Sequence, residues 1–225
     1  MHSWIYEFNL NVKGEEAERY LTTIIREWPA LYAEIPGVRG TLLLSNAFAL
    51  AGDYAYLFRV DVESLATLST IDRTIKSDDR RWRKVREDWF ERRTAVRARL
   101  VREARHGSSP DYLQPAKDGL VHYVFSHSTS SNGKASGHGT RALRTELSKA
   151  WETIDGVHSV QHLTAAMQAV GDKRYETWVR LRDLEVLDDV TAANDRLGPI
   201  LRDVPVNSQL FGELREVDGA LISGA

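Results

Sequence analysis

The sequence contains one segment twice, and this repeat constrains the fold more than any other feature. Residues 35–53 (IPGVRGTLLLSNAFALAGD) align without a gap on residues 154–172 (IDGVHSVQHLTAAMQAVGD), with seven identities in 19 positions. A repeat of this length indicates that one structural unit occurs twice. Beyond the shared Gly-Asp we expect two extra residues in the second copy, which would place Arg59 opposite Arg180.

Hydrophobic periodicity predicts the elements of the first half. Alternation of apolar and polar residues is typical of a half-buried strand, and apolar residues three and four positions apart are typical of an amphipathic helix. We expect Pro29 to kink or end the first helix, because proline lacks the backbone N–H. The predicted order is a strand at 4–10, a helix from 15, strands at 41–50 and 54–62, a helix from about 64 to 89, and a strand at 94–102.

The repeat predicts the same order in the second half, which would end in a strand at 208–217. The order β-α-β-β-α-β is the ferredoxin-like arrangement, so the fold class is α+β with antiparallel sheets. A stretch rich in Gly, Pro and Ser separates the halves and is typical of a linker. We therefore predict a first unit at 1–105, a linker at 106–119 and a second unit at 120–225.

Composition excludes several classes of function. The 30 Lys and Arg residues against 32 Asp and Glu give a net charge of -2, so we do not expect a nucleic-acid partner. The sequence has no apolar run of membrane-spanning length and no signal segment, which favours a cytoplasmic protein without a membrane partner. The absence of cysteine excludes thiolate chemistry and cysteine-bound metals.

The element order, together with residues 77–82 (SDDRRW), resembles the dimeric α+β barrel superfamily. That superfamily includes antibiotic-biosynthesis monooxygenases, aromatic polyketide cyclases, heme-degrading monooxygenases and NIPSNAP-like proteins, and the Asp-x-x-Trp segment resembles the start of the second helix in NIPSNAP-like members. The resemblance implies that two sheets pack together and that a ligand sits between sheet and helices. One chain would supply both units, as in the similar ring-opening oxygenases of angucycline pathways.

The polar faces of the predicted strands supply the candidate pocket. We expect Arg59, His162 and Trp178 to border one internal pocket, because apolar neighbours on the opposite strand faces would pack against helices. The residues expected under the helices are Leu44, Phe48 and Met167. The predicted substrate-binding residues are Glu7, Arg59, Ser126, Thr164, Gln168 and Trp178.

Oxygenation of a phenol needs a base to form the phenolate and a donor to hold the oxyanion. We expect His162 or His122 to be the base, with His162 preferred, and Arg180 or Asn9 to be the donor. Structural alternatives stay open: each histidine could be a buried structural residue. Arg59 and Arg180 could form ion pairs with carboxylates, for which the candidates are Glu7, Asp61 and Glu176.

No metal site is expected. His158 and His162 would be roughly 13 Å apart along a strand, too far to share an ion. A longer connection in the second half, residues 128–139, is expected to act as a mobile lid.

Three hypotheses of function follow. The first is a small oxygenase or cyclase of secondary metabolism, which encloses an aromatic polyketide-like substrate and works either without a cofactor or with reduced flavin. The second is a heme or small-ligand binding barrel in which His162 or His122 would be the axial ligand. The third is a non-catalytic interaction protein with a barrel filled by its own side chains. A homodimer is compatible with each of them.

Overall fold

The computed structural model describes residues 1–49, 53–104, 112, 120–129, 137–167, 173–198 and 206–224. Both halves follow the predicted alternation of strands and helices. The first half contains β1 (His2–Leu10), α1 (Glu15–Ala33), β2 (Val38–Asn46), the short 3-10 helix η1 (Ala47–Ala49), β3 (Tyr56–Val62), α2 (Leu65–Ile75), α3 (Arg80–Glu91) and β4 (Arg93–Glu103). The second half contains β5 (Val121–Thr129), α4 (Gly137–Trp151), β6 (Val157–Met167), β7 (Lys173–Leu181), α5 (Val186–Arg196), β8 (Val206–Val217) and β9 (Ala220–Ser223).

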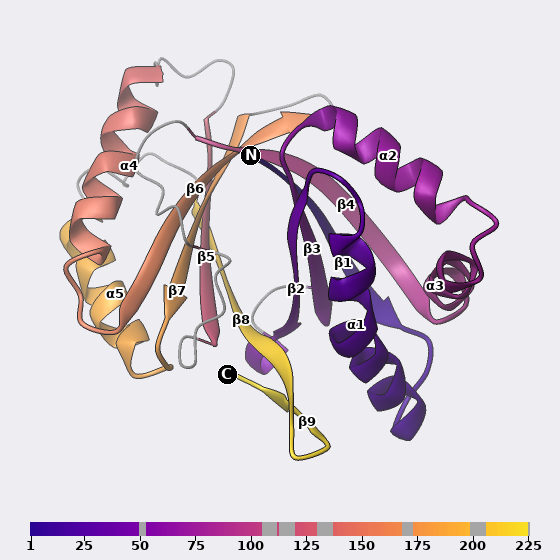
Figure 1. Ribbon diagram of the computed structural model, residues 1–225. Helices are drawn as coiled ribbons and strands as arrows, with labels where there is room; N and C mark the ends of the chain where they lie inside the picture. Colours follow the sequence, from indigo (N-terminus) through magenta and orange to yellow (C-terminus); the bar gives the residue numbers. More distant parts are fainter. Residues whose placement is uncertain are drawn as a thin grey trace.

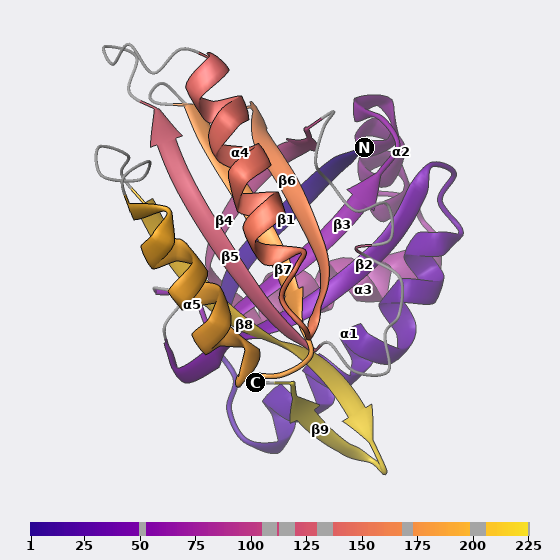
Figure 2. The ribbon, with the colours of Figure 1, turned by 90° about the vertical axis from the view of Figure 1, so that its left-hand side faces the viewer.

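Two antiparallel sheets close into one barrel. The strands β2-β3-β1-β4 form the sheet of the first half, and β6-β7-β5-β8 form that of the second. The sheets join at β4–β6 and again at β2–β8, where Leu44 stands opposite Glu213, so these eight strands form a closed ring. Figures 1 and 2 show α1, α2 and α3 outside one sheet and α4 and α5 outside the other. The predicted α+β barrel of two ferredoxin-like repeats is confirmed.

The repeat continues without a gap through the second strand pair. Val38 pairs with Val62 in the first half, and Val157 pairs with Leu181 in the second, each one residue before a bulge. Residues of β1, β2 and β3 therefore correspond to the residues numbered 119 higher in β5, β6 and β7. The expected two-residue insertion is wrong, and Arg59 corresponds to Trp178 rather than to Arg180. Sequence identity stops at the turn, so only the pairing register reveals this alignment.

A left-handed glycine follows the first helix of each half. Gly37 and Gly156 both have φ of 88°, a conformation in which only glycine avoids backbone strain. The carbonyl of Gly37 accepts a bond from the amide of Glu63 at 2.8 Å, and that of Gly156 accepts one from Arg182 at 2.7 Å. These equivalent turns connect the first helix of each half to the following hairpin in the same way.

Two helix predictions need correction. The first helix passes Pro29 and ends at Ala33, where buried Leu31 and Tyr32 hold its last turn against the core. The helix predicted from 64 to 89 is interrupted between α2 and α3. Asp79 caps α3, because its carboxylate accepts a bond from the amide of Arg81 at 2.7 Å.

The core has three parts. One apolar cluster lies between α1–α3 and the first sheet, and a second lies between α4–α5 and the second sheet. The third lies inside the barrel between the sheets and contains Ile5, Leu44, Leu57, Val101, Tyr112, Val124, Leu163, Trp178 and Phe211. Tyr112 belongs to the predicted linker, yet its side chain is only 1% exposed. The linker therefore contributes to the barrel interior.

Candidate functional site

Arg59 is held inside the barrel by its own strand. Its guanidinium donates to both carboxylate oxygens of Asp61, at 2.7 and 2.8 Å, and to Oε1 of Gln161 at 2.6 Å. The same group lies over the Trp178 ring, 4.9 Å from its centre. Of the three carboxylates considered as alternatives to a substrate, Asp61 pairs with Arg59 and neutralises the buried charge.

A second charged network joins the two sheets across the interior. Glu7 pairs with Arg97 at 2.6 Å and with Arg99 at 2.9 Å, and Arg99 also reaches Glu176 at 2.8 Å. The indole N–H of Trp178 donates to Glu176 at 3.0 Å. A pocket of about 120 Å³ lies beside Arg99 and Glu176 at the β4–β6 seam. The predicted binding residues Glu7 and Trp178 thus serve internal contacts.

His122 lies in a chain of buried polar groups. Its Nδ1 is 2.8 Å from the Tyr112 hydroxyl, and its Nε2 is 3.4 Å from the Glu213 carboxylate, which also accepts from Arg180 at 3.0 Å. Burial lowers the pKa of His122, so its ring is neutral. Ser126, four residues further along the same strand and on the same face, is also buried. The interior brings together most of the predicted residues, but as a packed network.

His162 lies on the other side of its strand from the prediction. Its Nε2 is 2.6 Å from Oγ of Ser148 in α4, and its Nδ1 is 2.9 Å from Oγ1 of Thr177 in β7. The neighbouring Leu163 packs inside the barrel instead. The assignment of His162 to the internal pocket with Arg59 and Trp178 is therefore wrong. Both faces of β6 are buried, so alternation alone does not identify the helix side.

The residues expected under the helices differ in the same way. Leu44 packs inside the barrel, whereas Phe48 and Met167 are 69% and 66% exposed. Phe48 lies in η1 with φ of 52°, and Met167 ends β6. Two apolar layers, rather than one, compete for the strand faces.

The remaining predicted residues have structural partners or lie outside the described residues. Thr164 shares the strand face of His162 and accepts a bond from Arg102 at 3.4 Å. The Asn9 amide bonds to the backbone of Asp53 and Ala55, at 2.9 and 2.7 Å, and so fixes the start of β3. Gln168 and residues 130–136 of the predicted lid are not among the described residues.

A polar cluster lies between α4 and the second sheet. His127 is 2% exposed, its ring stacks on that of Tyr175 with centres 5.1 Å apart, and neither ring nitrogen has a hydrogen-bond partner. The guanidinium of Arg144 lies 5.7 Å from the Tyr175 ring centre. We call this set the helix-side polar cluster; its members are His127, Arg144, Ser148, His162, Tyr175 and Thr177.

The first half is apolar at the same places. His127 pairs with Tyr175 as Phe8 pairs with Tyr56, and His162 pairs with Thr177 as Leu43 pairs with Phe58. At three positions the second half has a polar residue where the first half has Phe8, Leu43 or Phe58. These three apolar side chains belong to the core under α1. The same backbone arrangement thus carries apolar side chains in the first half and polar side chains in the second.

Both histidines of the cluster are neutral at pH 7. Burial, followed by the Arg144 cation, lowers the pKa of His127 to about 4 and that of His162 to about 3. The two nitrogens of His162 bond to hydroxyl groups, whereas those of His127 are open. His127 is therefore the ring that could accept a proton or hydrogen bond from a ligand.

The predicted heme ligands do not fit that role. A neutral imidazole binds iron through an unshared ring nitrogen, and both nitrogens of His162 and of His122 already contact other side chains. In the described ranges, no three His, Asp or Glu side chains lie close enough to hold a metal ion.

Sequence reasoning missed His127. From the alternation in β5, His122 and Ser126 are expected to face the pocket. The opposite face, which carries His127, is then expected to pack in the apolar core. The gap-free alignment would have revealed His127, because it places an imidazole opposite Phe8. Arg144 carried no signal, since its helix has polar residues on several sides.

Comparison with known proteins supports the fold. No protein-family model and no curated protein matches the sequence. Solved structures match over nearly the whole chain. A proposed monooxygenase from Fusobacterium nucleatum subsp. nucleatum has a TM-score of 0.65 and 10% identity, covering 97% of this chain and 95% of its own. An anthrone oxidase-like protein has 0.59 and 11%, covering 100% and 94%.

Chlorite dismutase from Candidatus Nitrospira defluvii is also similar, with a TM-score of 0.53, 11% identity, and 94% and 90% coverage. At these identities the likeness shows the dimeric α+β barrel fold that all of them share with this chain. Among the described helices, none is long and apolar enough to cross a lipid bilayer.

Proposed function

We propose that this protein is a small oxygenase that oxidises a phenolic, polyketide-like aromatic substrate at the helix-side polar cluster of its second half. The observation that carries the proposal is the buried imidazole of His127, which has no partner at a place where the first half has Phe8. A buried polar group without a partner costs free energy. A bound substrate that donates a hydrogen bond would recover it.

The names of the similar structures support an oxidation as the reaction class. They include monooxygenases and an anthrone oxidase-like protein. In an oxidation of the anthrone type, an activated CH₂ group and O₂ give a carbonyl group and water, and the substrate supplies all four electrons. The step begins when a base removes a proton from the substrate.

His127 is suited to accept that proton. Its lowered pKa keeps the ring unprotonated at neutral pH, so the lone pair is available. A base with such a low pKa is weak, and a nearby cation compensates by stabilising the substrate anion. Arg144, on the same side of the sheet, supplies that charge. His162, bonded to Ser148 and Thr177, would orient the site rather than act as the base.

The barrel interior is a poorer substrate site. In the described residues it is occupied by Tyr112, Trp178 and three sets of ion pairs. The hypothesis of a non-catalytic interaction protein expected a barrel filled by its own side chains, and the described part of the interior agrees with that expectation. The helix-side polar cluster favours the oxygenase hypothesis instead, because a purely structural core has no need of an unpartnered imidazole.

The test is oxygen consumption by the purified protein with anthrones and other phenolic aromatics, with and without reduced flavin. We expect turnover that falls about a hundredfold or more in His127→Phe. His158→Phe is the matched control, since His158 is an exposed histidine of β6, and it should retain the rate. Equal rates in wild type and His127→Phe would remove His127 from the mechanism. A requirement for reduced flavin would show that the substrate does not supply all the electrons.

A further inference from the structure

The first half contains a buried arginine without a carboxylate. Arg93 begins β4 and is 8% exposed. Its Nε donates to the carbonyl oxygen of Trp89 at 2.9 Å, and its Nη1 has no hydrogen-bond partner. No ion pair links Arg93 to an acidic side chain in the described part of the chain, whereas the fully buried Arg59 is paired with Asp61.

Aromatic rings surround the Arg93 guanidinium. It lies over the ring of Trp89 and 5.3 Å from the centre of Phe8. The Tyr20 hydroxyl is buried beside Arg93 and interacts with its guanidinium, and no other hydrogen-bond partner lies near it in the described residues. Cation–π contacts offset part of the cost of burying a charge. They provide no acceptor for the N–H groups of Nη1, and burial lowers the pKa of Arg93 to about 9.

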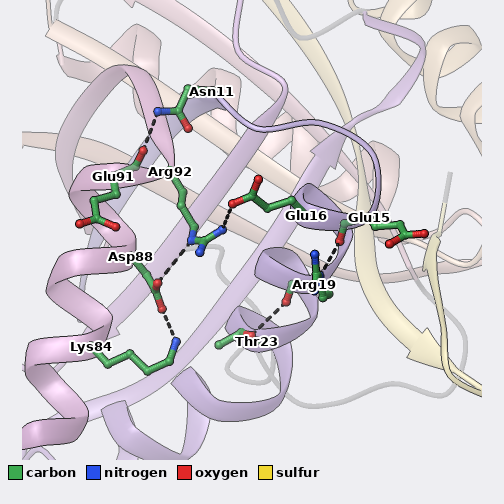
Figure 3. A network of polar contacts seen from close by, with 9 residues as sticks. All are labelled: Asn11, Glu15, Glu16, Arg19, Thr23, Lys84, Asp88, Glu91 and Arg92. Carbon is green, nitrogen blue, oxygen red and sulfur yellow. Dashed lines mark hydrogen bonds and ion pairs between the residues drawn. The ribbon is translucent and has the colours of Figure 1, made fainter.

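A hollow at the surface is lined in part by Tyr20, the residue that lies beside Arg93. The hollow has a volume of about 230 Å³ and lies between α1 and α3. At its mouth Arg92 pairs with Glu16 at 2.5 Å and with Asp88 at 3.3 Å, and Lys84 pairs with Asp88 at 2.5 Å (Figure 3). The carboxylates at the mouth are thus already paired with cations other than Arg93.

We infer that Arg93 and Tyr20 form a binding site for a small aromatic carboxylate in the first half. A carboxylate has two oxygens, one for the free N–H of Arg93 and one for the hydroxyl of Tyr20, and it supplies the missing negative charge. The ring of the ligand would lie among the aromatic side chains. This site is separate from the helix-side polar cluster and does not depend on the proposed oxygenase activity.

The probe is benzoate, and benzamide is its neutral control. Isothermal titration of the whole protein should show that benzoate binds at least tenfold more tightly than benzamide. Arg93→Met and Tyr20→Phe should each weaken benzoate binding, the former by about tenfold or more, as expected for a hydrogen bond to a charged group. Arg83→Met should bind benzoate like wild type, because Arg83 is an exposed arginine of α3 that pairs with Asp78 and does not line the hollow.

Two further measurements keep the result interpretable. His127→Phe should leave benzoate binding unchanged, and loss of binding in that variant would place the ligand in the second half and overturn the inference. Arg93→Lys keeps the charge but lacks the planar fork of N–H groups, so it should bind more weakly than wild type and more tightly than Arg93→Met. Equal benzoate binding by wild type, Arg93→Met and Arg93→Lys, or no binding by wild type, would also overturn it.

Discussion

His127 in β5 lies where Phe8 lies in β1, and each ring stacks on a tyrosine of the adjacent strand. The ring centres are 5.1 Å apart for His127 and Tyr175, and 5.6 Å apart for Phe8 and Tyr56. The first half thus shows how the second would pack without a site. This internal comparison supplies a natural substitution for each polar position.

We expect His127→Phe to stabilise the protein although it lowers the rate of turnover. The change replaces an unpartnered buried imidazole by the ring that the first half uses, and it removes a penalty of about 1–3 kcal/mol. Urea unfolding would measure the gain in the free energy of unfolding. A loss of stability would show that His127 makes contacts that a phenyl ring cannot replace.

The reciprocal change, Phe8→His, should destabilise the first half. It introduces a polar ring into an apolar core between Tyr56 and Trp89, which costs about 1–3 kcal/mol when no partner is present. The same unfolding experiment measures it. If both substitutions lower stability equally, the two halves differ in packing more than their pairing registers indicate.

The free energy of unfolding should fall as the pH decreases from about 6.5 toward 4. The folded-state pKa values of His127 and His162, about 4 and about 3, lie below their ordinary value of 6.5. The unfolded chain therefore binds protons in this window before the folded chain does, and each histidine contributes up to about 1.4 kcal/mol per pH unit. Urea titrations at pH 7, 6 and 5 would measure the slope.

The double variant His127→Phe with His162→Leu should have a shallower slope over the same window. His122 also has a lowered pKa because it is buried, so some dependence should remain. An unchanged slope in the double variant would show that neither of the two rings is held neutral by the fold.

Gly37→Ala and Gly156→Ala should destabilise the protein by similar amounts. Both glycines have φ of 88°, and an added Cβ would lie 2.6 Å from Oγ1 of Thr67 or 2.5 Å from Cγ2 of Val186. The strain of the left-handed conformation alone is expected to cost about 1–2 kcal/mol. Thermal unfolding of both variants measures it, and Gly14→Ala is the control with the same backbone sign but open space around the Cβ.

Tyr112 should anchor the connection between the halves. Tyr112→Phe removes the hydrogen bond to His122 and should cost about 1 kcal/mol. Tyr112→Ala also leaves a cavity inside the barrel, for which about 3–5 kcal/mol is typical of an aromatic side chain. Denaturant unfolding of both variants would separate the two contributions. Equal effects would show that the hydrogen bond, and not packing, retains the segment.

The repeat, the α+β class and the order of helices and strands can all be predicted from the sequence alone. Periodicity identifies a strand or helix because it reflects only neighbours within one element. The helix interruption at Asp79 and the passage of α1 beyond Pro29 depended on local capping and packing, which periodicity describes less well. The sequence left three candidate carboxylates open for Arg59, and its pairing with Asp61 is consistent with residues two apart on a strand sharing a face.

Tertiary packing determines which face of each strand points to the barrel interior and which points to the helices. In a closed barrel with helices outside, strands such as β6 are buried on both faces, so His162 and Leu163 are equally compatible with either side. The pairing register then gives the alignment of the two halves, in which His127 occupies the position equivalent to Phe8. The site depends on contacts between residues far apart in the chain, such as Ser148 with His162, and those distances arise only when the strands and helices pack.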